Sequence, residues 1–216
     1  YSYYTYQCDS LMASPNGDKL WDSFLVEAVG KGLKGKQLHN AIPHRRMSAT
    51  IYKNYPQGKI TVTDFLLGQY YLYEDALNSQ EWNIESDSMK VVLGHECQKA
   101  TCSFRGRKWT AWFALDVPVS DGPLKFCGLP GLIMEVYDRG KQYYFCINGM
   151  QQVSATPITY GILDKDFKHF QKTDRKDFLL SKYRYLRNQN SINEASTGIS
   201  LGSVDEALKY DLIEKE

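Results

Sequence analysis

Short segments of alternating polar and apolar residues, each as long as a β-strand, follow one another through the middle of the chain. In an extended segment successive side chains point to opposite faces, so this alternation predicts strands with one buried face. The pattern predicts strands at residues 60–65, 70–74, 82–85, 89–93, 95–104, 109–115, 132–137 and 142–148. Connections this short join antiparallel neighbours, so the sequence predicts a β-meander.

Two of these connections carry residues suited to hairpin turns. Residues 105–108 include Gly106 and residues 138–140 end in Gly140, and glycine tolerates the backbone angles of tight turns. The strand after the first turn places four apolar side chains on one face: Trp109, Ala111, Phe113 and Leu115.

The two ends of the chain have different patterns. Residues 1–8 and 22–29 favour two further strands. Residues 174–188 have apolar side chains at helical spacing behind a capping Asp174, and residues 203–208 predict a second, short helix. The segment between the helices is polar and predicts a connection.

These patterns predict a β-rich α+β protein. We expect an antiparallel β-meander, as a curved sheet or half-barrel, with C-terminal helices packed against it. We expect a single domain over residues 1–216, with the β-meander over about 1–157 and the helical part over about 160–212.

Composition excludes two classes of partner. The 216 residues carry 26 Lys and Arg against 25 Asp and Glu, a net charge of +1, which offers no basic field for nucleic acid. No apolar run approaches the roughly 20 residues that span a bilayer, so we expect no membrane span.

The sequence begins at Tyr1 without Met, which fits either a removed export signal or a trimmed chain.

The cysteines and histidines show no metal-binding spacing, and we expect no metal and no cofactor. Five cysteines allow two disulfides and one free thiol in several combinations. Cys97 and Cys102 would lie on opposite faces of one strand, which argues against pairing them. The glycines of residues 30–35 match a dinucleotide-binding spacing, but no βαβ unit surrounds them.

Two clusters of glycine and proline lie close together after the predicted central hairpin. The first is Pro118-Val119-Ser120-Asp121-Gly122-Pro123 and the second is Gly128-Leu129-Pro130-Gly131-Leu132-Ile133. Such clusters fix the direction of the backbone twice within a short stretch. They indicate either a tight crossover inside the sheet or a preformed loop beside a ligand site.

The second cluster spells the hexapeptide for which the GLPGLI family of the Bacteroidetes is named. Residues 51–149 resemble the core pattern of that family in its order, including the stretches at residues 53–56, 58–61, 94–101, 104–107, 110–113 and 121–123. Residues 208–215 look like a diverged form of the family's C-terminal ending.

The resemblance implies more about location than about chemistry. Family members are typically exported through a signal peptide, which implies a protein of the periplasm or cell envelope. The family has no established activity. His95 stands where the family usually has an aromatic residue, and Cys102 and Cys127 stand where it has no fixed cysteine.

An enzymatic alternative rests on two groups of residues. His95 and Cys97 share a strand face about 7 Å apart, which suits a Cys/His hydrolase. Asp116, Asp121 and Glu135 offer a carboxylate pair instead. A structural cysteine beside a half-buried histidine, and carboxylates that cap turns, explain the same residues without catalysis. We therefore assign no catalytic residue.

The main expectation is a noncatalytic binding or accessory protein. Arg105 and Arg107 lie at a hairpin tip beside an aromatic stretch, which suits an amphiphile, an extended peptide or an envelope protein partner, although they also suit a solvated turn. The aromatic residues on the two hairpins either form this surface or pack under the C-terminal helices: Trp109, Trp112, Phe113, Tyr143, Tyr144 and Phe145. The candidate ligand-binding residues are Arg105, Arg107, Trp109, Trp112, Asp121, Gly128, Pro130 and Gly131.

Overall fold

The computed structural model describes residues 17–33, 37, 41, 49–151, 170–188, 191, 195 and 212–215. The chain divides into two compact units. The first consists of Tyr1–Tyr6, Ala49–Leu179 and Asp211–Glu216, and the second of Gln7–Ser48 and Leu180–Tyr210. The expectation of one domain stays a prediction, and the strand expected at residues 1–8 and the helix expected at 203–208 lie outside the described residues.

The second unit contains helix α1 (Gly17–Gly30), where the sequence predicted a strand at residues 22–29. That prediction was wrong, because a short apolar run fits either period. Ala28 is buried while Val26 is 71% exposed, so burial does not follow the apolar pattern. The helix ends at Gly30, and two residues later Gly32 has a φ of 71°, which allows the amide of Leu33 to reach back to the Ala28 carbonyl.

The first unit contains two sheets. The first sheet has the order β1-β2-β3-β9, with β1 (Thr50–Lys53), β2 (Lys59–Leu66), β3 (Gln69–Ala76) and β9 (Gln171–Lys172). β1, β2 and β3 pair antiparallel, and β9 lies parallel to β3. Leu67 and Gly68 form a two-residue turn in which both φ angles are positive, as a tight hairpin requires.

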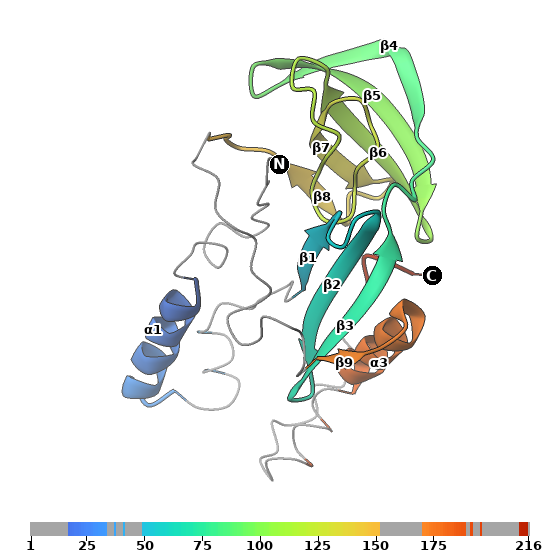
Figure 1. Ribbon diagram of the computed structural model, residues 1–216. Helices are drawn as coiled ribbons and strands as arrows, with labels where there is room; N and C mark the ends of the chain where they lie inside the picture. The colour runs from blue at the N-terminus through green and yellow to red at the C-terminus, as the bar shows by residue number, and fades with distance from the viewer. Residues whose placement is uncertain are drawn as a thin grey trace. The chain divides into compact units, whose positions relative to one another are not determined.

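The second sheet is a five-stranded meander of strands in sequence order (Figure 1). It consists of β4 (Asn83–Val92), β5 (His95–Phe104), β6 (Arg107–Ala114), β7 (Leu132–Asp138) and β8 (Tyr144–Cys146), all antiparallel. The sheet is strongly curved and is not closed into a barrel (Figure 1). The two sheets together confirm the predicted β-rich fold, in which every strand pair except β3 with β9 is antiparallel.

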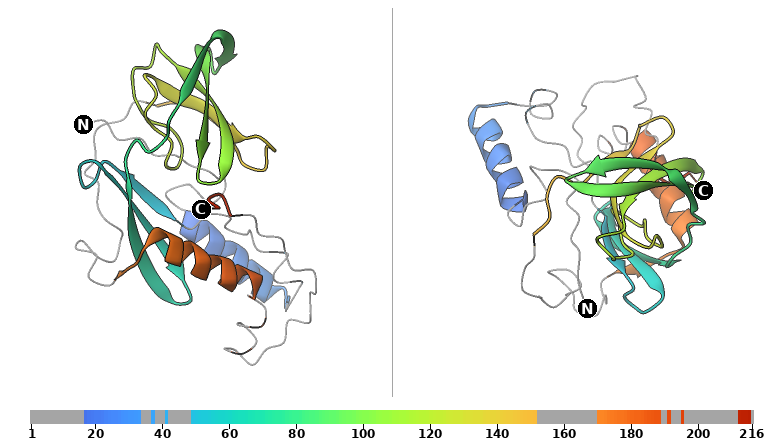
Figure 2. Two further views of the ribbon diagram at one scale, coloured as in Figure 1. Left: turned by 90° about the vertical axis from the view of Figure 1, so that its right-hand side faces the viewer. Right: turned by 90° about the horizontal axis from the view of Figure 1, so that it is seen from above.

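The start of helix α3 (Arg175–Arg187), up to Leu179, belongs to the first unit and packs against the first sheet (Figure 2). Its start is capped as predicted, because the Lys176 amide donates to Asp174 Oδ1 at 2.7 Å. The Phe178 ring is buried against Tyr71 and Tyr73 of β3, with ring centroids 5.5 and 5.6 Å apart. No helix in the described part of the chain is long and apolar enough to cross a membrane.

The connection between β6 and β7 provides the cover for the second sheet. Phe126 and Leu129 from this connection join the buried cluster on one face of the sheet. The Phe126 ring lies edge to face with the Trp109 ring, with the ring centroids 4.7 Å apart. Trp109 and Phe113 therefore pack under the glycine- and proline-rich connection rather than under helix α3. The connection is thus part of the hydrophobic core of this sheet.

Candidate functional site

The turn between β5 and β6 positions the two arginines singled out by the sequence. Arg105 and Gly106 form this turn with φ angles of 51° and 73°, and Arg107 begins β6. Arg107 is buried, with 4% of its side chain exposed, and Arg105 is 24% exposed. The solvated-turn interpretation of these two residues is therefore wrong.

The Arg107 guanidinium binds two consecutive peptide carbonyls. Its Nε donates to the Ile213 carbonyl at 2.9 Å and its Nη2 to the Leu212 carbonyl at 2.8 Å. On its other side Nη1 donates to Asp138 Oδ2 at 2.8 Å and to Gln142 Oε1 at 2.9 Å. The paired carboxylate compensates the buried charge, and the fixed fork of donors holds the peptide groups of residues 212 and 213.

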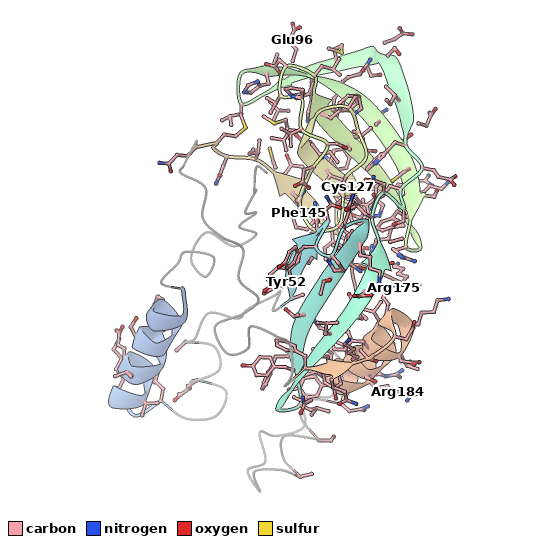
Figure 3. The ribbon with its side chains drawn as sticks, viewed as in Figure 1. Tyr52, Glu96, Cys127, Phe145, Arg175 and Arg184 are labelled. Carbon is pink, nitrogen blue, oxygen red and sulfur yellow. The ribbon has the colours of Figure 1, made fainter. Side chains whose placement is uncertain are left out.

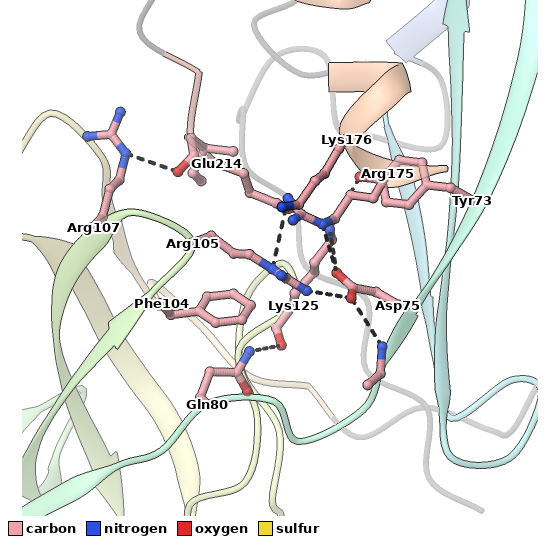
Figure 4. Close-up of polar contacts among 12 residues, drawn as sticks. Tyr73, Asp75, Gln80, Phe104, Arg105, Arg107, Lys125, Arg175, Lys176 and Glu214 are labelled. Carbon is pink, nitrogen blue, oxygen red and sulfur yellow. Dashed lines mark hydrogen bonds and ion pairs between the residues drawn. The ribbon is translucent and has the colours of Figure 1, made fainter. Parts of the chain in front are cut away.

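A cluster of charged side chains lies beside this contact, and we call it the ion cluster (Figure 4). It joins residues from β3, the β5–β6 turn, the β6–β7 connection, the start of α3 and the C-terminal segment: Asp75, Arg105, Lys125, Arg175 and Glu214. Figure 3 shows Arg175 at the first turn of α3. Five separate parts of the chain thus meet at one polar centre.

Glu214 is held by the cations of the ion cluster. Its Oε1 lies 2.5 Å from Lys125 Nζ, and its Oε2 accepts from Arg175 Nη1 at 3.2 Å. The side chains of Lys125 and Arg175 are only 5% and 7% exposed, so water screens these contacts weakly. Buried ions must be paired to be tolerated, and Glu214 is one of the partners that make these cations tolerable.

Asp75 is the second carboxylate of the ion cluster. Its Oδ1 accepts from Arg105 Nη2 at 2.5 Å, and its Oδ2 accepts from Lys125 Nζ at 3.2 Å. Lys125 Nζ also lies 3.3 Å from the Tyr73 hydroxyl. Burial, with Glu214, Asp64 and Asp75 next in importance, raises the pKa of Tyr73 far above its usual range and keeps the phenol neutral.

The ion cluster has three cations and two carboxylates, and one N–H donor of Arg105 has no acceptor among the described residues. Arg105 Nε is buried and makes no hydrogen bond among the described residues. Glu214 Oε2 lies 3.9 Å from this nitrogen, which is within ion-pair range but too far for a hydrogen bond. The Glu214 carboxylate therefore leaves one donor of the Arg105 guanidinium without an acceptor.

The C-terminal segment, residues 212–215, is bound through its backbone as well as through Glu214. Besides the two carbonyls held by Arg107, the Lys215 amide donates to the Arg105 carbonyl at 3.1 Å. Arg107 also lies with its guanidinium carbon 4.8 Å from the centroid of the Tyr143 ring. The segment thus lies against the β5–β6 turn as a short peptide ligand would.

Among the other candidate residues, Asp121 has a structural partner. Lys53 Nζ donates to Asp121 Oδ1 and to the Gly122 carbonyl, both at 2.5 Å, and to the Phe126 carbonyl at 2.8 Å. Burial lowers the pKa of Lys53 despite the opposing effect of Asp121. Lys53 belongs to β1, so it attaches the β6–β7 connection to the first sheet.

The glycines of the hexapeptide serve the backbone. Gly128 has a φ of 91°, which favours glycine, and a Cβ at Gly131 would lie 2.0 Å from the Ala114 carbonyl oxygen. Pro130 between them is exposed. These residues fix the path that carries Leu129 into the core, and none of them contacts the ion cluster in the described structure.

The two tryptophans of the candidate site lie on opposite faces of β6. Trp109 is 2% exposed and donates from Nε1 to the Phe104 carbonyl at 3.0 Å. Trp112 lies on the other face with Lys90 Nζ 4.8 Å above its ring, and its Nε1 has no hydrogen-bond partner in the described part of the chain. The structure therefore brings Arg105 and Arg107 together with the C-terminal segment, and it separates Trp112 from them.

The residues of the enzymatic alternative are occupied in other ways. His95 Nδ1 lies 2.7 Å from Asp116 Oδ2, while Cys97 is fully buried with Sγ 3.5 Å from the His95 carbonyl. Burial raises the pKa of the Cys97 thiol, the opposite of what a nucleophilic cysteine needs. Glu135 is paired with Lys90, so it and Asp121 have separate partners.

The cysteines and possible metal ligands give no further site in the described residues. Cys97, Cys102, Cys127 and Cys146 are free thiols, and Cys97 and Cys102 lie in different buried clusters on opposite faces of β5, as expected from their spacing. Within the same residues no group of three His, Cys, Asp or Glu side chains is placed to hold a metal ion.

Sequence reasoning missed four members of the ion cluster: Asp75, Lys125, Arg175 and Glu214. The one signal available was Lys125, a charged residue between Leu124 and Phe126 in an apolar stretch of the connection. A lysine there has to find a partner when the stretch is buried. The partner's position in the chain could not be read from that pattern.

Comparisons with known proteins identify a family match over part of the chain. The model of a family described as "Protein of unknown function (Porph_ging)" matches residues 105–135, which include both arginines and the β6–β7 connection. No curated protein matches the chain. The chain thus shares a segment with a family whose function is not known.

Two solved structures, both of PNGF-II, are similar to part of this chain. The structure in the C2 space group has a TM-score of 0.43 and 16% identity over 65% of this chain, and the one in P21 has a TM-score of 0.39 and 17% identity over 58%. This chain covers 26% and 23% of those chains, which is about a quarter of their length.

Proposed function

We propose that this protein is a noncatalytic binding or accessory protein of the cell envelope that binds an extended peptide at the β5–β6 turn. Membership of the GLPGLI family and export to the periplasm belong to the same proposal, and the match to a family of unknown function over residues 105–135 is compatible with them. The peptide is favoured over an amphiphile because the groups presented at the turn are polar and directional.

One observation carries the proposal: the buried Arg107 guanidinium donates to two consecutive main-chain carbonyls. Contacts to the main chain recognise an extended peptide whatever its side chains are, and side-chain contacts then add specificity. Asp138 and Gln142 hold the guanidinium in this orientation from the opposite side. The donors are therefore already positioned before a peptide arrives.

The test uses the full chain with Glu214→Lys, which places a cation against the ion cluster and drives the C-terminal segment off the turn. The probe is a fluorescein-labelled peptide of residues 210–216, and its anisotropy reports binding. We expect the probe to bind this variant. Adding Arg107→Lys should weaken binding at least tenfold, because lysine keeps the charge beside Asp138 but lacks the fork of donors.

Arg139→Lys is the matched control, because Arg139 is exposed one residue beyond Asp138. It should leave the affinity unchanged. The proposal fails if the probe does not bind the Glu214→Lys chain, or if Arg107→Lys and Arg139→Lys bind it equally well.

A further inference from the structure

We propose that Arg105, Lys125 and Arg175 form a carboxylate subsite, and that the C-terminal segment is a resident occupant which an acidic partner peptide displaces. This inference rests on the proposed function, because it names the class of peptide and the regulation of the same site. The partner is an extended peptide with a carboxylate side chain directly after the two residues whose carbonyls Arg107 holds.

The charges of the ion cluster define this partner. With Glu214 in place, Arg105 and Lys125 share two carboxylates among the described residues; with Glu214 removed, these two cations are left with Asp75 as their carboxylate partner there. Lys125 and Arg175 are more than nine-tenths buried, so water cannot replace the missing carboxylate efficiently. A peptide that leaves this position neutral is therefore discriminated against.

The geometry of the bound peptide sets the spacing. Arg107 holds the carbonyls of residues 212 and 213, and the next residue, Glu214, reaches the cations. The amide of the following residue, Lys215, is bound to the Arg105 carbonyl. Main-chain contacts thus bracket the acidic position on both sides, which fixes where a carboxylate must stand in the partner.

The resident segment leaves part of the subsite unsatisfied. Arg105 Nε is buried without a hydrogen bond among the described residues, because Glu214 Oε2 stays 3.9 Å away. A buried donor without an acceptor raises the free energy of the occupied state. A partner whose carboxylate approaches Arg105 more closely gains this hydrogen bond, and it can therefore compete with a segment that is present in every copy of the chain.

The experiment compares three full-length chains: the unaltered one, Glu214→Lys, and Glu81→Lys as a charge-matched control at an exposed position. Each is titrated with the labelled peptide of residues 210–216 and with the same peptide carrying Glu214→Gln. We expect the Glu214→Lys chain to bind the unaltered peptide at least tenfold more tightly than the other two chains do. The Gln peptide should bind at least tenfold more weakly.

A second readout follows the resident segment directly. Hydrogen exchange at the amides of residues 212–215 in the unaltered chain should increase when the labelled peptide is added in excess, and the Gln peptide should cause a smaller increase. The label separates the probe from the chain's own segment by mass.

The possible outcomes distinguish the inference from the proposed function. Equal affinity of the three chains, with no change in exchange, shows that the segment does not compete and overturns the inference while leaving peptide binding intact. Equal affinity for the Glu and Gln peptides overturns the carboxylate subsite. Absence of binding to every chain overturns both proposals. If Glu214→Lys loses its near-UV circular dichroism, Glu214→Gln replaces it, with at least a threefold gain expected.

Discussion

Gly131 lies so close to Ala114 that a Cβ at position 131 would come within 2.0 Å of the Ala114 carbonyl oxygen. The neighbour is main chain at the end of β6, which cannot move without disturbing the β6–β7 pairing. Replacement of Gly131 by any other residue therefore requires a shift of the sheet. The last glycine of the hexapeptide is fixed by this approach.

We expect Gly131→Ala to lower the free energy of unfolding by about 2–4 kcal/mol, as overpacking against a rigid neighbour does. Urea unfolding followed by tryptophan fluorescence measures it. Gly140→Ala is the matched control, because its Cβ would meet only Gln142 side-chain atoms at 3.6 Å or more. Equal losses in the two variants would show that the approach to Ala114 does not determine the choice of glycine.

Phe126→Ala should remove the main aromatic contact between the β6–β7 connection and the second sheet. The ring centroid of Phe126 lies 4.7 Å from that of Trp109 and 6.0 Å from that of Phe104, and Phe126 is 3% exposed. We expect a loss of about 3–5 kcal/mol in the free energy of unfolding, measured by urea titration. Phe65→Ala, at a residue that is 47% exposed, should cost less than half as much. A larger effect at Phe65 would contradict the assignment of the core.

Lys53→Met should destabilise the protein because it removes at least three contacts at once. The ammonium group is the partner of Asp121, the Gly122 carbonyl and the Phe126 carbonyl. Removal of one partner of a largely buried pair leaves the other charge uncompensated and costs about 3–5 kcal/mol, which thermal unfolding can measure.

Lys59→Met is the control for this change. Lys59 pairs with Glu74 across β2 and β3, where the two side chains are 50% and 42% exposed. An exposed pair of this kind contributes about 0–1 kcal/mol. If the two lysine variants melt at the same temperature, Lys53 does not have the structural role described above.

The buried Cys102 thiol should make stability depend on alkaline pH. Burial raises its pKa from 9.0 to about 12. Between these values the unfolded chain loses the proton and the folded chain keeps it, so the free energy of unfolding falls as pH rises from about 9 towards 12. Below pH 9 both states are protonated and this contribution is constant.

Cys102→Ala should reduce that fall, which urea titrations at pH 7, 9 and 10.5 can show. Ser103→Ala is the control, because Ser103 is exposed beside Cys102 and carries no thiol, so the change should leave the dependence on pH as it is. The same slope in Cys102→Ala and in the unaltered chain would count against a neutral, buried thiol at position 102.

The sequence predicted most strands because alternation of apolar and polar residues survives in sheets with one buried face. It divided β4 into two segments, at residues 82–85 and 89–93, because the register between β4 and β5 shifts between Glu85 and Met89. It placed a strand in α1 because the apolar residues there fit both periods. Assignment of the strands to two sheets could not be predicted, since pairing between distant segments leaves no local pattern.

The candidate site was predicted only in part for the same reason. The hairpin tip is local, so Arg105 and Arg107 were identifiable from a turn signal. Their partners are remote: Arg107 binds the Ile213 carbonyl 106 residues away, and Arg105 binds Asp75 30 residues away. Burial also reverses the interpretation of these arginines, because a charged residue in a turn is usually exposed.

The ammonium group of Lys53 couples the unfolding of the two sheets. Lys53 is part of one sheet, whereas the three acceptors described above belong to the connection that fills the core of the other. Unfolding of either sheet must therefore break the contacts of Lys53 and leave its charged ammonium group unpaired in a partly unfolded core. The two sheets should therefore denature together, in one cooperative transition, despite having no strand in common.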